Sequence, residues 1–425
     1  MKKKKLIALL LCLAILSSLL TACGGSTENA ASGTKANEQV TLSYTLWNKD
    51  QEPIMQNIAR EFEKEHPNIK IKIELTPYGQ YWTKLETSAT GGVMPDIVWM
   101  NGPRVTKYAK AGIIEPLDEY VKRDGLDLNN YPKGLVDLYT VDGKLYGMPK
   151  DFDLTALWYN KKLFDEAKVP YPTNEWTWED LAAAAKKLTN KDKGIYGIAF
   201  TNDNQVGIYN TIAQAGGYVI SPDRKKSGYD LPETKKGIQV WVDLIKEGTS
   251  PGLQEITETP VDDMFQSGKL AMTFAASWQV KPYLENENVK NDIDLVVMPK
   301  LQTRSAVIHG LGYAISSTCK NKDAAWEFVK FCGEKKANDM QAESGVVIPA
   351  YKSSLEGWLK SYPHVNLKAF TDELEYSYMY PSSKETAKWN AIEDEYLKQV
   401  WAGEMSVDEA CNKMAEEMNK ILAEE

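Results

Sequence analysis

Aromatic and polar side chains occur together at several positions where a predicted strand ends. The groups are Trp47 with Asp50, Trp99 with Asn101 and Arg104, and Trp278 with Gln279, and a further polar set, Lys150, Asp151 and Asp153, lies between two predicted strands. In open α/β sheets, ligands bind beyond the carboxyl ends of the strands. A sugar ring offers apolar C–H faces to aromatic planes and a belt of hydroxyls to carboxylate, amide or guanidinium groups. The pattern therefore favours a site for a carbohydrate or a similar polar solute.

An alternation of strands and helices is predicted to position these side chains. Residues 40–46 and 69–75 alternate apolar with polar residues, which is typical of strands, and Ile54, Ile58 and Phe62 follow helical spacing between them. Repeated strand–helix units indicate a mostly parallel sheet. Further predicted strands are 95–100, 145–148, 154–159, 196–200, 270–274, 295–298 and 306–315, and further helices are 81–89, 104–111, 177–188, 235–246, 323–332 and most of the last 60 residues.

The first 24 residues, MKKKKLIALLLCLAILSSLLTACG, have the order of an export signal, with lysines before an apolar run. The run is shorter than the ~20 apolar residues of a membrane span. Its end, Leu-Thr-Ala-Cys, resembles the lipobox of bacterial lipoproteins, in which the cysteine is acylated and becomes the first residue. We therefore expect a signal peptide at 1–22, lipidation of Cys23 and a flexible tether over 23–39. A plain cleaved signal that leaves Cys23 as a free thiol is the alternative.

The composition disfavours several classes of function. Four of the 50 basic residues and none of the 59 acidic residues lie before residue 23, so the remaining chain has a net charge of −13. This charge disfavours nucleic acid and anionic lipid as partners. Cys319, Cys332 and Cys411 do not indicate a disulfide framework, and the three histidines have no metal-ligand spacing, so we expect no metal and no cofactor. A chain of 425 residues predicts two lobes.

Seven segments resemble, in the same order, the extracellular solute-binding proteins of carbohydrate ABC importers, the group that includes maltose-binding protein. They are LSYTLWNKDQEP (42–53), FEKEHPNIKI (62–71), residues 91–117, YGMPKDFDLTALWYNKKLF (146–164), WTWEDLAAAAKKLT (176–189), residues 213–219 and FQSGKLAMTFAASW (265–278). The resemblance implies a two-lobed α/β fold like that of periplasmic binding proteins, each lobe a mostly parallel sheet flanked by helices, with a ligand cleft between them. Lobe 1 would comprise 41–117 and 303–342, and lobe 2 would comprise 118–302 and 343–425.

The resemblance also implies ligand contacts from both lobes. Matching the chain to the family position by position gives Trp47, Asp50, Asn101 and Arg104 in lobe 1, and Asp151, Tyr209, Trp278 and Trp389 in lobe 2. Asn101 departs from the family pattern, because relatives often have an acid there, and this indicates a different pattern of bound hydroxyls. Asp153 and Asn204 match the family less closely.

The mechanism implied by the resemblance is closure of the lobes on a sugar, with a preference for a di- or oligosaccharide, and delivery to ABC transporter permease subunits. The protein would be a monomer held by a lipid anchor on Cys23 at the extracellular face of the cell membrane of a Gram-positive bacterium. No nucleic acid partner is expected.

Several residues have a structural interpretation instead of a functional one. Apolar surroundings predict core positions for Trp158, Trp241, Trp326 and Trp401, while Trp176 and Trp178 are predicted to pack at the start of the helix at 177–188. For Trp389, a core position and contact with a polar ligand both remain open. Gly310 and Gly312 indicate either backbone that lies against a ligand or a bulge.

A secreted carbohydrate-active hydrolase is the main alternative, since such enzymes also use paired carboxylates and tryptophans. Asp151 and Asp153 are the one obvious pair, and we expect them to point to opposite faces of the chain. No Gly-x-Ser-x-Gly, HExxH or Walker A sequence occurs, so catalysis is not expected. A binder of another polar solute, such as a glycerol phosphate, and an adhesin or structural lipoprotein are the remaining alternatives.

Overall fold

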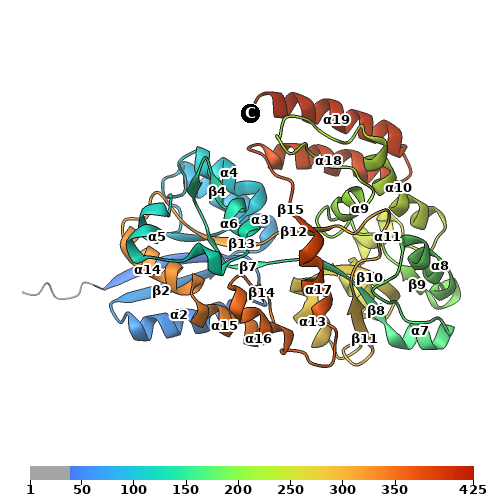
Figure 1. Ribbon diagram of the computed structural model, residues 1–425, viewed down its shortest axis with the longest axis horizontal. Helices are drawn as coiled ribbons and strands as arrows, with labels where there is room; N and C mark the ends of the chain where they lie inside the picture. Colours follow the sequence, from blue (N-terminus) through green and yellow to red (C-terminus); the bar gives the residue numbers. More distant parts are fainter. Residues whose placement is uncertain (1–38) are drawn as a thin grey trace, which may run out of the picture. The chain divides into compact units, whose positions relative to one another are not determined.

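The computed structural model describes residues 39–425, so the predicted signal peptide, Cys23 and the tether before residue 39 lie outside the described residues. Two main sheets, each covered by helices, make up the described part (Figure 1). One hydrophobic core joins the first sheet to one face of the second, and another lies on the opposite face of the second sheet. No helix within residues 39–425 is long and apolar enough to cross a membrane.

The first sheet has the strand order β2-β1-β3-β13-β6. Strand β1 pairs in parallel with β2 and β3, whereas β13 is antiparallel to β3 and β6, so the sheet is mixed rather than mostly parallel. Alternation predicted β1 and β2; in β1, Leu42, Tyr44 and Leu46 point into the core with no exposed surface. The strands are β1 (Val40–Leu46), β2 (Ile69–Leu75), β3 (Ile97–Asn101), β6 (Met148–Pro149) and β13 (Leu311–Ile315).

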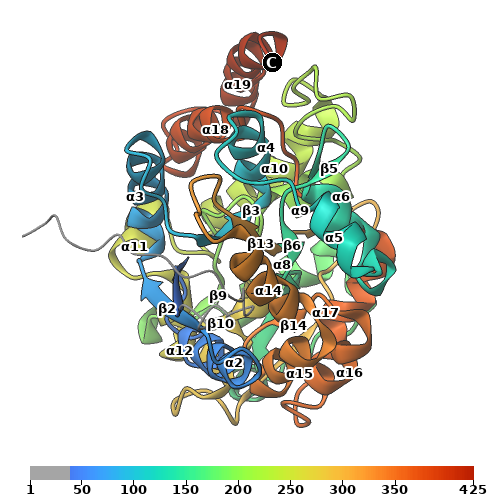
Figure 2. The ribbon, with the colours of Figure 1, turned by 90° about the vertical axis from the view of Figure 1, so that its left-hand side faces the viewer.

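Helices from two separate parts of the chain cover the first sheet (Figure 2). Helix α2 buries Ile54, Ile58 and Phe62, as their helical spacing predicted, and has Pro53 in its first turn, where the missing N–H costs nothing. The covering helices are α2 (Glu52–Glu65), α3 (Tyr78–Thr90), α4 (Gly102–Lys110), α14 (Lys322–Gly333) and α15 (Lys335–Ser344).

The second sheet has the strand order β11-β8-β10-β9. Strand β8 is antiparallel to both of its neighbours, and only β10 and β9 pair in parallel. This differs from the expected parallel pairing, because a pattern of strands and helices records buried faces but not strand direction. The strands are β8 (Thr155–Asn160), β9 (Tyr196–Ile198), β10 (Leu270–Ala276) and β11 (Ile293–Val296).

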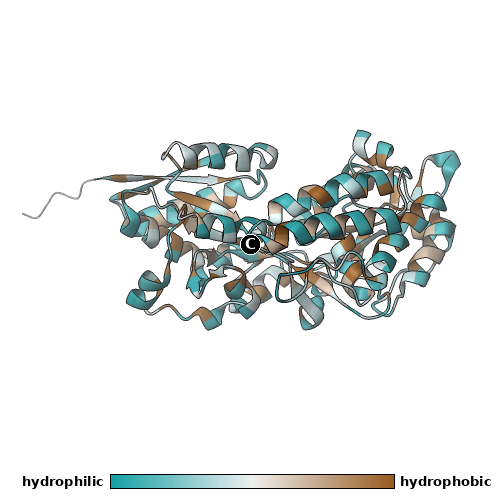
Figure 3. Ribbon diagram, turned by 90° about the horizontal axis from the view of Figure 1, so that it is seen from above, coloured by the Kyte–Doolittle hydropathy of each residue, from teal (hydrophilic) through white to brown (hydrophobic). Residues whose placement is uncertain are grey.

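Amphipathic helices cover the second sheet, and hydrophilic and hydrophobic residues alternate along them (Figure 3). Thr177 caps α8 as a capping box: its hydroxyl accepts from the N–H of Asp180 at 3.2 Å, and the Asp180 carboxylate accepts from the N–H of Thr177 at 2.9 Å. Helices α7 (Lys161–Ala167) and α8 (Trp178–Leu188) pack on the strands, while α9 (Ile208–Gln214), α10 (Pro232–Lys246), α18 (Thr386–Trp401) and α19 (Val407–Ala423) share the same core, with α18 and α19 packed on each other and on α10.

Several segments run between the two sheets. Strand β7 (Asp151–Phe152) follows β6 directly and pairs with β14 (Ile348–Pro349), while β12 (Ala306–Ile308) pairs with β15 (Ser377–Met379). Asp153 forms a β-bridge with His309. The strand predicted at 306–315 is therefore two strands, separated where the chain passes between the sheets.

The part of the chain that packs with the first sheet extends further along the sequence than the resemblance implied. Strand β6 pairs with β13, and Trp326 of α14 donates its indole N–H to Asp124 of α5 at 2.8 Å. Residues 118–149 therefore pack with the first sheet, although the expected lobe boundary lay at 117. The reason is that β6 completes the sheet edge before the chain crosses.

Short elements complete the described chain. They are α5 (Asp118–Asp124), α6 (Lys133–Leu138), β4 (Thr140–Val141), β5 (Lys144–Leu145), α11 (Leu253–Glu258), α12 (Val261–Gln266), α13 (Val280–Leu284), α16 (Leu355–Leu359), α17 (Lys368–Asp372), and the 3-10 turns η1 (Leu128–Asn130), η2 (Lys191–Lys193), η3 (Ser277–Gln279), η4 (Lys352–Ser354) and η5 (Glu373–Tyr376). The last 60 residues are thus less helical than predicted. The predicted core tryptophans, Trp158, Trp241, Trp326 and Trp401, are buried, and the three described cysteines are free and buried.

Candidate functional site

A cavity of about 680 Å³ lies between elements of the two sheets. Five of the predicted contact residues line it: Trp47, Asp50, Asn101, Asp151 and Trp278. They arrive from the ends of β1, β3 and β10 and from the crossing strand β7, so the strand-end pattern predicted where they meet. The remaining lining residues are Asn48, Lys49, Gln51, Tyr78, Pro103, Asp153, Asn202, Asp203, Asn204, Gln205, His309, Leu311, Tyr380, Asn390 and Asp394.

The turn between β1 and α2 forms one side of the cavity. The side-chain oxygen of Asn48 accepts from the backbone N–H groups of Asp50 at 2.8 Å and Gln51 at 3.1 Å. Such a bond replaces a backbone bond and fixes a tight turn. The turn therefore holds Asp50 at the cavity surface.

Aromatic rings face the cavity from both sides. Trp47 is half-buried and packs edge-on against Tyr81 and Trp99, with ring centres 4.8 and 5.2 Å away. Tyr78, beside it, is 55% exposed, and Trp278 is half-buried at the end of β10. Of the rings that line the cavity, Trp47, Tyr78 and Trp278 are at least partly exposed and offer apolar planes to a ligand, and the packing of Trp47 fixes the orientation of its own ring.

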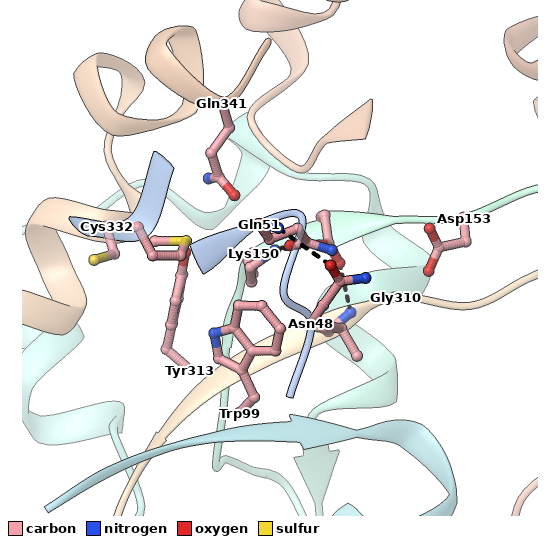
Figure 4. A network of polar contacts seen from close by, with 12 residues as sticks. Asn48, Gln51, Trp99, Lys150, Asp153, Gly310, Tyr313, Cys332 and Gln341 are labelled. Atoms are coloured by element: carbon pink, nitrogen blue, oxygen red, sulfur yellow. Dashed lines mark hydrogen bonds and ion pairs between the residues drawn. The ribbon is translucent and has the colours of Figure 1, made fainter. Parts of the chain in front are cut away.

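A buried ion pair includes Asp151, one of the lining residues, and its partner Lys150 is labelled in Figure 4. Lys150 and Asp151 pair with each other at 0% and 1% side-chain exposure. The Lys150 ammonium also donates to Gln51 at 2.6 Å and lies 4.5 Å from the centre of the Trp99 ring. A buried charge needs such compensation, and here the pair orients the Asp151 carboxylate at the cavity.

Asp153 and His309 are buried on the segments that cross between the sheets. The Ser277 hydroxyl donates to Asp153 at 3.1 Å, and burial together with the Asp151 charge raises the pKa of Asp153 well above its usual value. Burial lowers the pKa of His309 to about 4, so its imidazole is neutral at pH 7 and accepts from the N–H of Gly102 at 3.2 Å. Both carboxylates, Asp151 and Asp153, line the same cavity. The expectation of opposite faces was wrong, because residues two apart in a strand share a face.

Asn101 carries an unpaired acceptor at the cavity. The residue is 6% exposed, and its side-chain oxygen has no hydrogen-bond partner among residues 39–425. Buried polar atoms are almost always paired, with protein, water or ligand. This oxygen is therefore a buried, unsatisfied acceptor on a residue that lines the cavity.

The comparisons with known proteins decide the family. The model of the bacterial extracellular solute-binding protein family matches residues 48–339, which is most of the chain. The chain belongs to this family. Its members are binding proteins rather than enzymes, and they act outside the cytoplasm, which agrees with the predicted export.

Relatives of this solute-binding protein span nearly its whole length. A galactooligosaccharide-binding protein from Bacillus subtilis (strain 168) is 26% identical over 430 residues, covering 97% of this chain and 96% of the relative. An arabinooligosaccharide-binding protein from the same strain is 24% identical over 79% of this chain and 78% of the relative. The structure of an ABC substrate-binding protein from Listeria monocytogenes in complex with cycloalternan superposes with a TM-score of 0.85 at 26% identity, covering 91% of this chain and 99% of that protein. This likeness confirms the two-lobed fold.

Three predicted contact residues of this solute-binding protein do not line the cavity. Trp389 has no exposed surface, and its indole N–H donates to the Ser383 hydroxyl at 2.9 Å. Tyr209 is likewise fully buried, and the Arg104 guanidinium lies 4.9 Å from the centre of the Trp82 ring. The apolar turns of α18 and α9 face the second core, so they hold Trp389 and Tyr209 inside it.

Sequence reasoning missed several residues that line the cavity. Tyr380, Asn390 and Asp394 come from the C-terminal part of the chain, and His309 comes from the break between β12 and β13. A polar position on an otherwise apolar helix face, such as Asn390 next to Trp389, was the one available signal. Asn204, a weaker family match, does line the cavity.

A second cavity, of about 540 Å³, shares Tyr380 with the first and contains none of the predicted contact residues. Within residues 39–425, no cluster of three or more His, Cys, Asp or Glu side chains is arranged to hold a metal ion.

Proposed function

We propose that this protein captures an oligosaccharide outside the cell and delivers it to the membrane permease of an ABC importer. The observation that carries the proposal is the main cavity, where Trp47, Tyr78 and Trp278 stand among carboxylates and amides. Aromatic planes suit the faces of sugar rings, and charged or amide groups suit their hydroxyls. The names of the relatives, which bind galactooligosaccharides, arabinooligosaccharides and cycloalternan, support the same class of ligand.

Capture would proceed by closure of the two lobes. A ligand held by Trp47 on one side and Trp278 on the other gains contacts that the open form lacks, and only such differential affinity can shift the equilibrium toward the closed form. The permease would then receive the closed, monomeric protein and release the sugar. No chemical step on the sugar is proposed.

A thermal-shift screen of the protein without residues 1–23 tests this function. The probes are galactooligosaccharides, arabinooligosaccharides and maltotriose, and a sugar at a hundredfold excess over its Kd should stabilise the fold by about 2.7 kcal/mol. Trp278→Ala should abolish the shift, whereas Trp176→Ala, which alters a half-buried tryptophan outside the cavity, should retain it. A native protein that no saccharide stabilises would contradict the carbohydrate assignment.

The lipid anchor on Cys23 is a further part of the proposal. Two acyl chains on this cysteine would hold the protein at the extracellular face of the cell membrane of a Gram-positive bacterium, whereas a single chain binds only marginally. Metabolic labelling with a palmitate analogue should mark the native protein and not Cys23→Ser, while Cys12→Ser should still be labelled. Label on the Cys23→Ser protein would overturn the anchor.

A further inference from the structure

Glu393 is a fully buried carboxylate directly behind one wall of the main cavity. Four donors converge on it. Oε2 accepts from the amide of Asn204 at 2.7 Å, the hydroxyl of Tyr209 at 2.7 Å and the amide of Asn390 at 2.8 Å, and Oε1 accepts from the hydroxyl of Tyr229 at 2.7 Å. Three of the four bonds fall on Oε2, so that oxygen is fully occupied by donors, while Oε1 accepts one.

Two of the four donors belong to the cavity wall. Asn204 and Asn390 both line the cavity, and both turn their amide NH₂ groups toward Glu393. In each of these side-chain amides, the oxygen points away from the NH₂ group that donates to Glu393. Among residues 39–425 neither oxygen has a hydrogen-bond partner, and neither is a buried atom left unpaired. The two oxygens are thus accessible, unpaired acceptors on residues that line the cavity.

We propose that Glu393 is a positioning residue that fixes both amides with their oxygens toward the cavity, so that this wall accepts hydrogen bonds and selects a ligand with hydroxyl donors at both points. The inference rests on the proposed function and adds a specificity determinant to it. An asparagine without such a partner can turn its amide and present a donor instead. Glu393 removes that freedom at two positions at once.

The same arrangement makes the wall sensitive to pH. Burial raises the pKa of Glu393 to about 7, and the hydrogen bonds from its partners oppose a larger rise. A protonated Glu393 is itself a donor and needs an acceptor. An asparagine that turns its oxygen toward Glu393 then presents its NH₂ group to the cavity. Acidification below pH 7 should therefore weaken the binding of a hydroxyl donor.

The titratable groups around Glu393 are of two kinds: those that do not change charge below pH 8, and other carboxyls. Burial raises the pKa values of Tyr209, Tyr229 and Tyr380 well above 10 and that of Cys411 to about 12, so none of these changes charge below pH 8. Three further carboxyls have pKa values raised by burial: Asp203 in the neighbouring loop, Asp394 on the same helix and Asp153 on the crossing segment. The test must separate Glu393 from these three.

Calorimetric titration with a galactooligosaccharide at pH 8 and pH 6 makes this separation. The ionised fraction of a group with a pKa near 7 falls from ~0.9 to ~0.1, so Kd should rise about tenfold in the native protein. Glu393→Gln, which places an NH₂ group among the donors, should bind more weakly at pH 8 and show almost no pH dependence. Glu395→Gln removes an exposed carboxylate of the same helix and should keep the native ratio. A tenfold change that persists in Glu393→Gln would overturn the proposal.

A ligand-free measurement tests the positioning itself. The side-chain NH₂ signals of Asn204 and Asn390 in ¹⁵N NMR spectra, assigned by their loss in Asn204→Asp and Asn390→Asp, should shift with a midpoint near pH 7. The shift should be absent in Glu393→Gln. Tyr229→Phe removes one donor without replacing the carboxylate, so it should move the midpoint upward if the Gln variant does not fold. Signals that do not respond to pH would overturn the proposal, whereas failure of all saccharides to bind would contradict only the proposed function.

Discussion

The backbone N–H of Leu311 donates to the carboxylate of Asp151 at 2.9 Å, and in return the N–H of Lys150 donates to the carbonyl of Leu311 at 2.8 Å. This pair of bonds joins the strand that leaves the first sheet to the strand that returns to it. Asp151 also lines the main cavity and pairs with the buried Lys150. A ligand that contacts Asp151 would therefore touch a segment that crosses between the two sheets.

Replacing Asp151 by asparagine should destabilise the fold strongly. The change leaves the fully buried Lys150 ammonium without its counter-ion, and breaking a buried pair in this way costs about 3–5 kcal/mol. Urea unfolding measures the loss. Asp137→Asn breaks the exposed pair with Lys133 and should change the unfolding free energy by less than ~1 kcal/mol. Equal effects of the two variants would show that Lys150 is not held as a buried charge.

Gly310→Ala should also destabilise the protein. A Cβ atom at this position would lie 2.3 Å from the carbonyl oxygen of Asp151, a backbone atom that cannot move aside easily. Forcing extra atoms into a packed site costs roughly 1–3 kcal/mol. Gly79→Ala is the matched control, because a Cβ there meets nothing within 4 Å. Chemical unfolding should leave that control as stable as the native protein or more so. The glycine in the predicted strand thus serves close backbone packing.

His309 should make stability fall as the pH falls. Its pKa in the folded protein is about 4, below the ordinary value of 6.5, so the unfolded chain takes up the proton first. The stabilisation is complete above pH 6.5 and is lost progressively between pH 6.5 and pH 4. The difference between the pKa values of His309 in the unfolded and folded states corresponds to about 3 kcal/mol of unfolding free energy. In unfolding experiments at pH 7 and pH 4.5, His309→Gln should lose less stability on acidification than the native protein, and an unchanged loss would contradict the buried neutral imidazole.

Glu393 should have the opposite effect on the pH dependence of stability. Its pKa of about 7 in the folded protein exceeds the ordinary value of 4.5, so the ionised carboxylate costs stability above pH 7 and the cost is relieved as the pH falls toward 4.5. The native protein should therefore gain up to about 3 kcal/mol from this group on acidification, and Glu393→Gln should not. Comparing the two proteins at pH 8 and pH 5 isolates the contribution. In the native protein, the contributions of His309 and Glu393 to the change of unfolding free energy with pH should largely cancel.

Trp389→Phe should affect folding but not binding. The substitution leaves a small void and removes the indole N–H that donates to Ser383, which should cost about 1–3 kcal/mol of unfolding free energy. Since Trp389 does not reach the cavity, the sugar Kd should stay within about twofold of the native value at pH 8. A large loss of affinity with intact stability would return Trp389 to the ligand site.

The fold could be predicted as far as hydrophobic patterns record buried faces. Strands β1 and β2 have the predicted bounds because alternating residues along them enter the core. The crossing that breaks the predicted strand at His309 and Gly310 depends on contacts with Asp151 and Asp153 more than 100 residues away, and strand direction in the second sheet depends on pairing between strands far apart in the sequence. No local pattern contains that information.

The site was predictable where it lies at strand ends. Trp47 and Trp278 follow strands directly, so their neighbours in the sequence reveal a polar edge. Tyr380 and Asn390 reach the cavity only because α18 and the segment before it fold back onto the second core. Trp389 shows the limit of matching positions to a family, since a shift of one residue on a helix turns a side chain from the cavity to the core.

The unequal burial of the tryptophans gives the protein a built-in optical reporter. Nine of the twelve are buried, and of the three half-buried ones only Trp47 and Trp278 line the main cavity. A sugar that displaces water from these two indoles should move their emission to shorter wavelength, while the buried nine contribute a constant background. Intrinsic fluorescence can therefore follow ligand arrival and departure in real time without any label, and the Trp47→Phe and Trp278→Phe proteins would report the two walls separately.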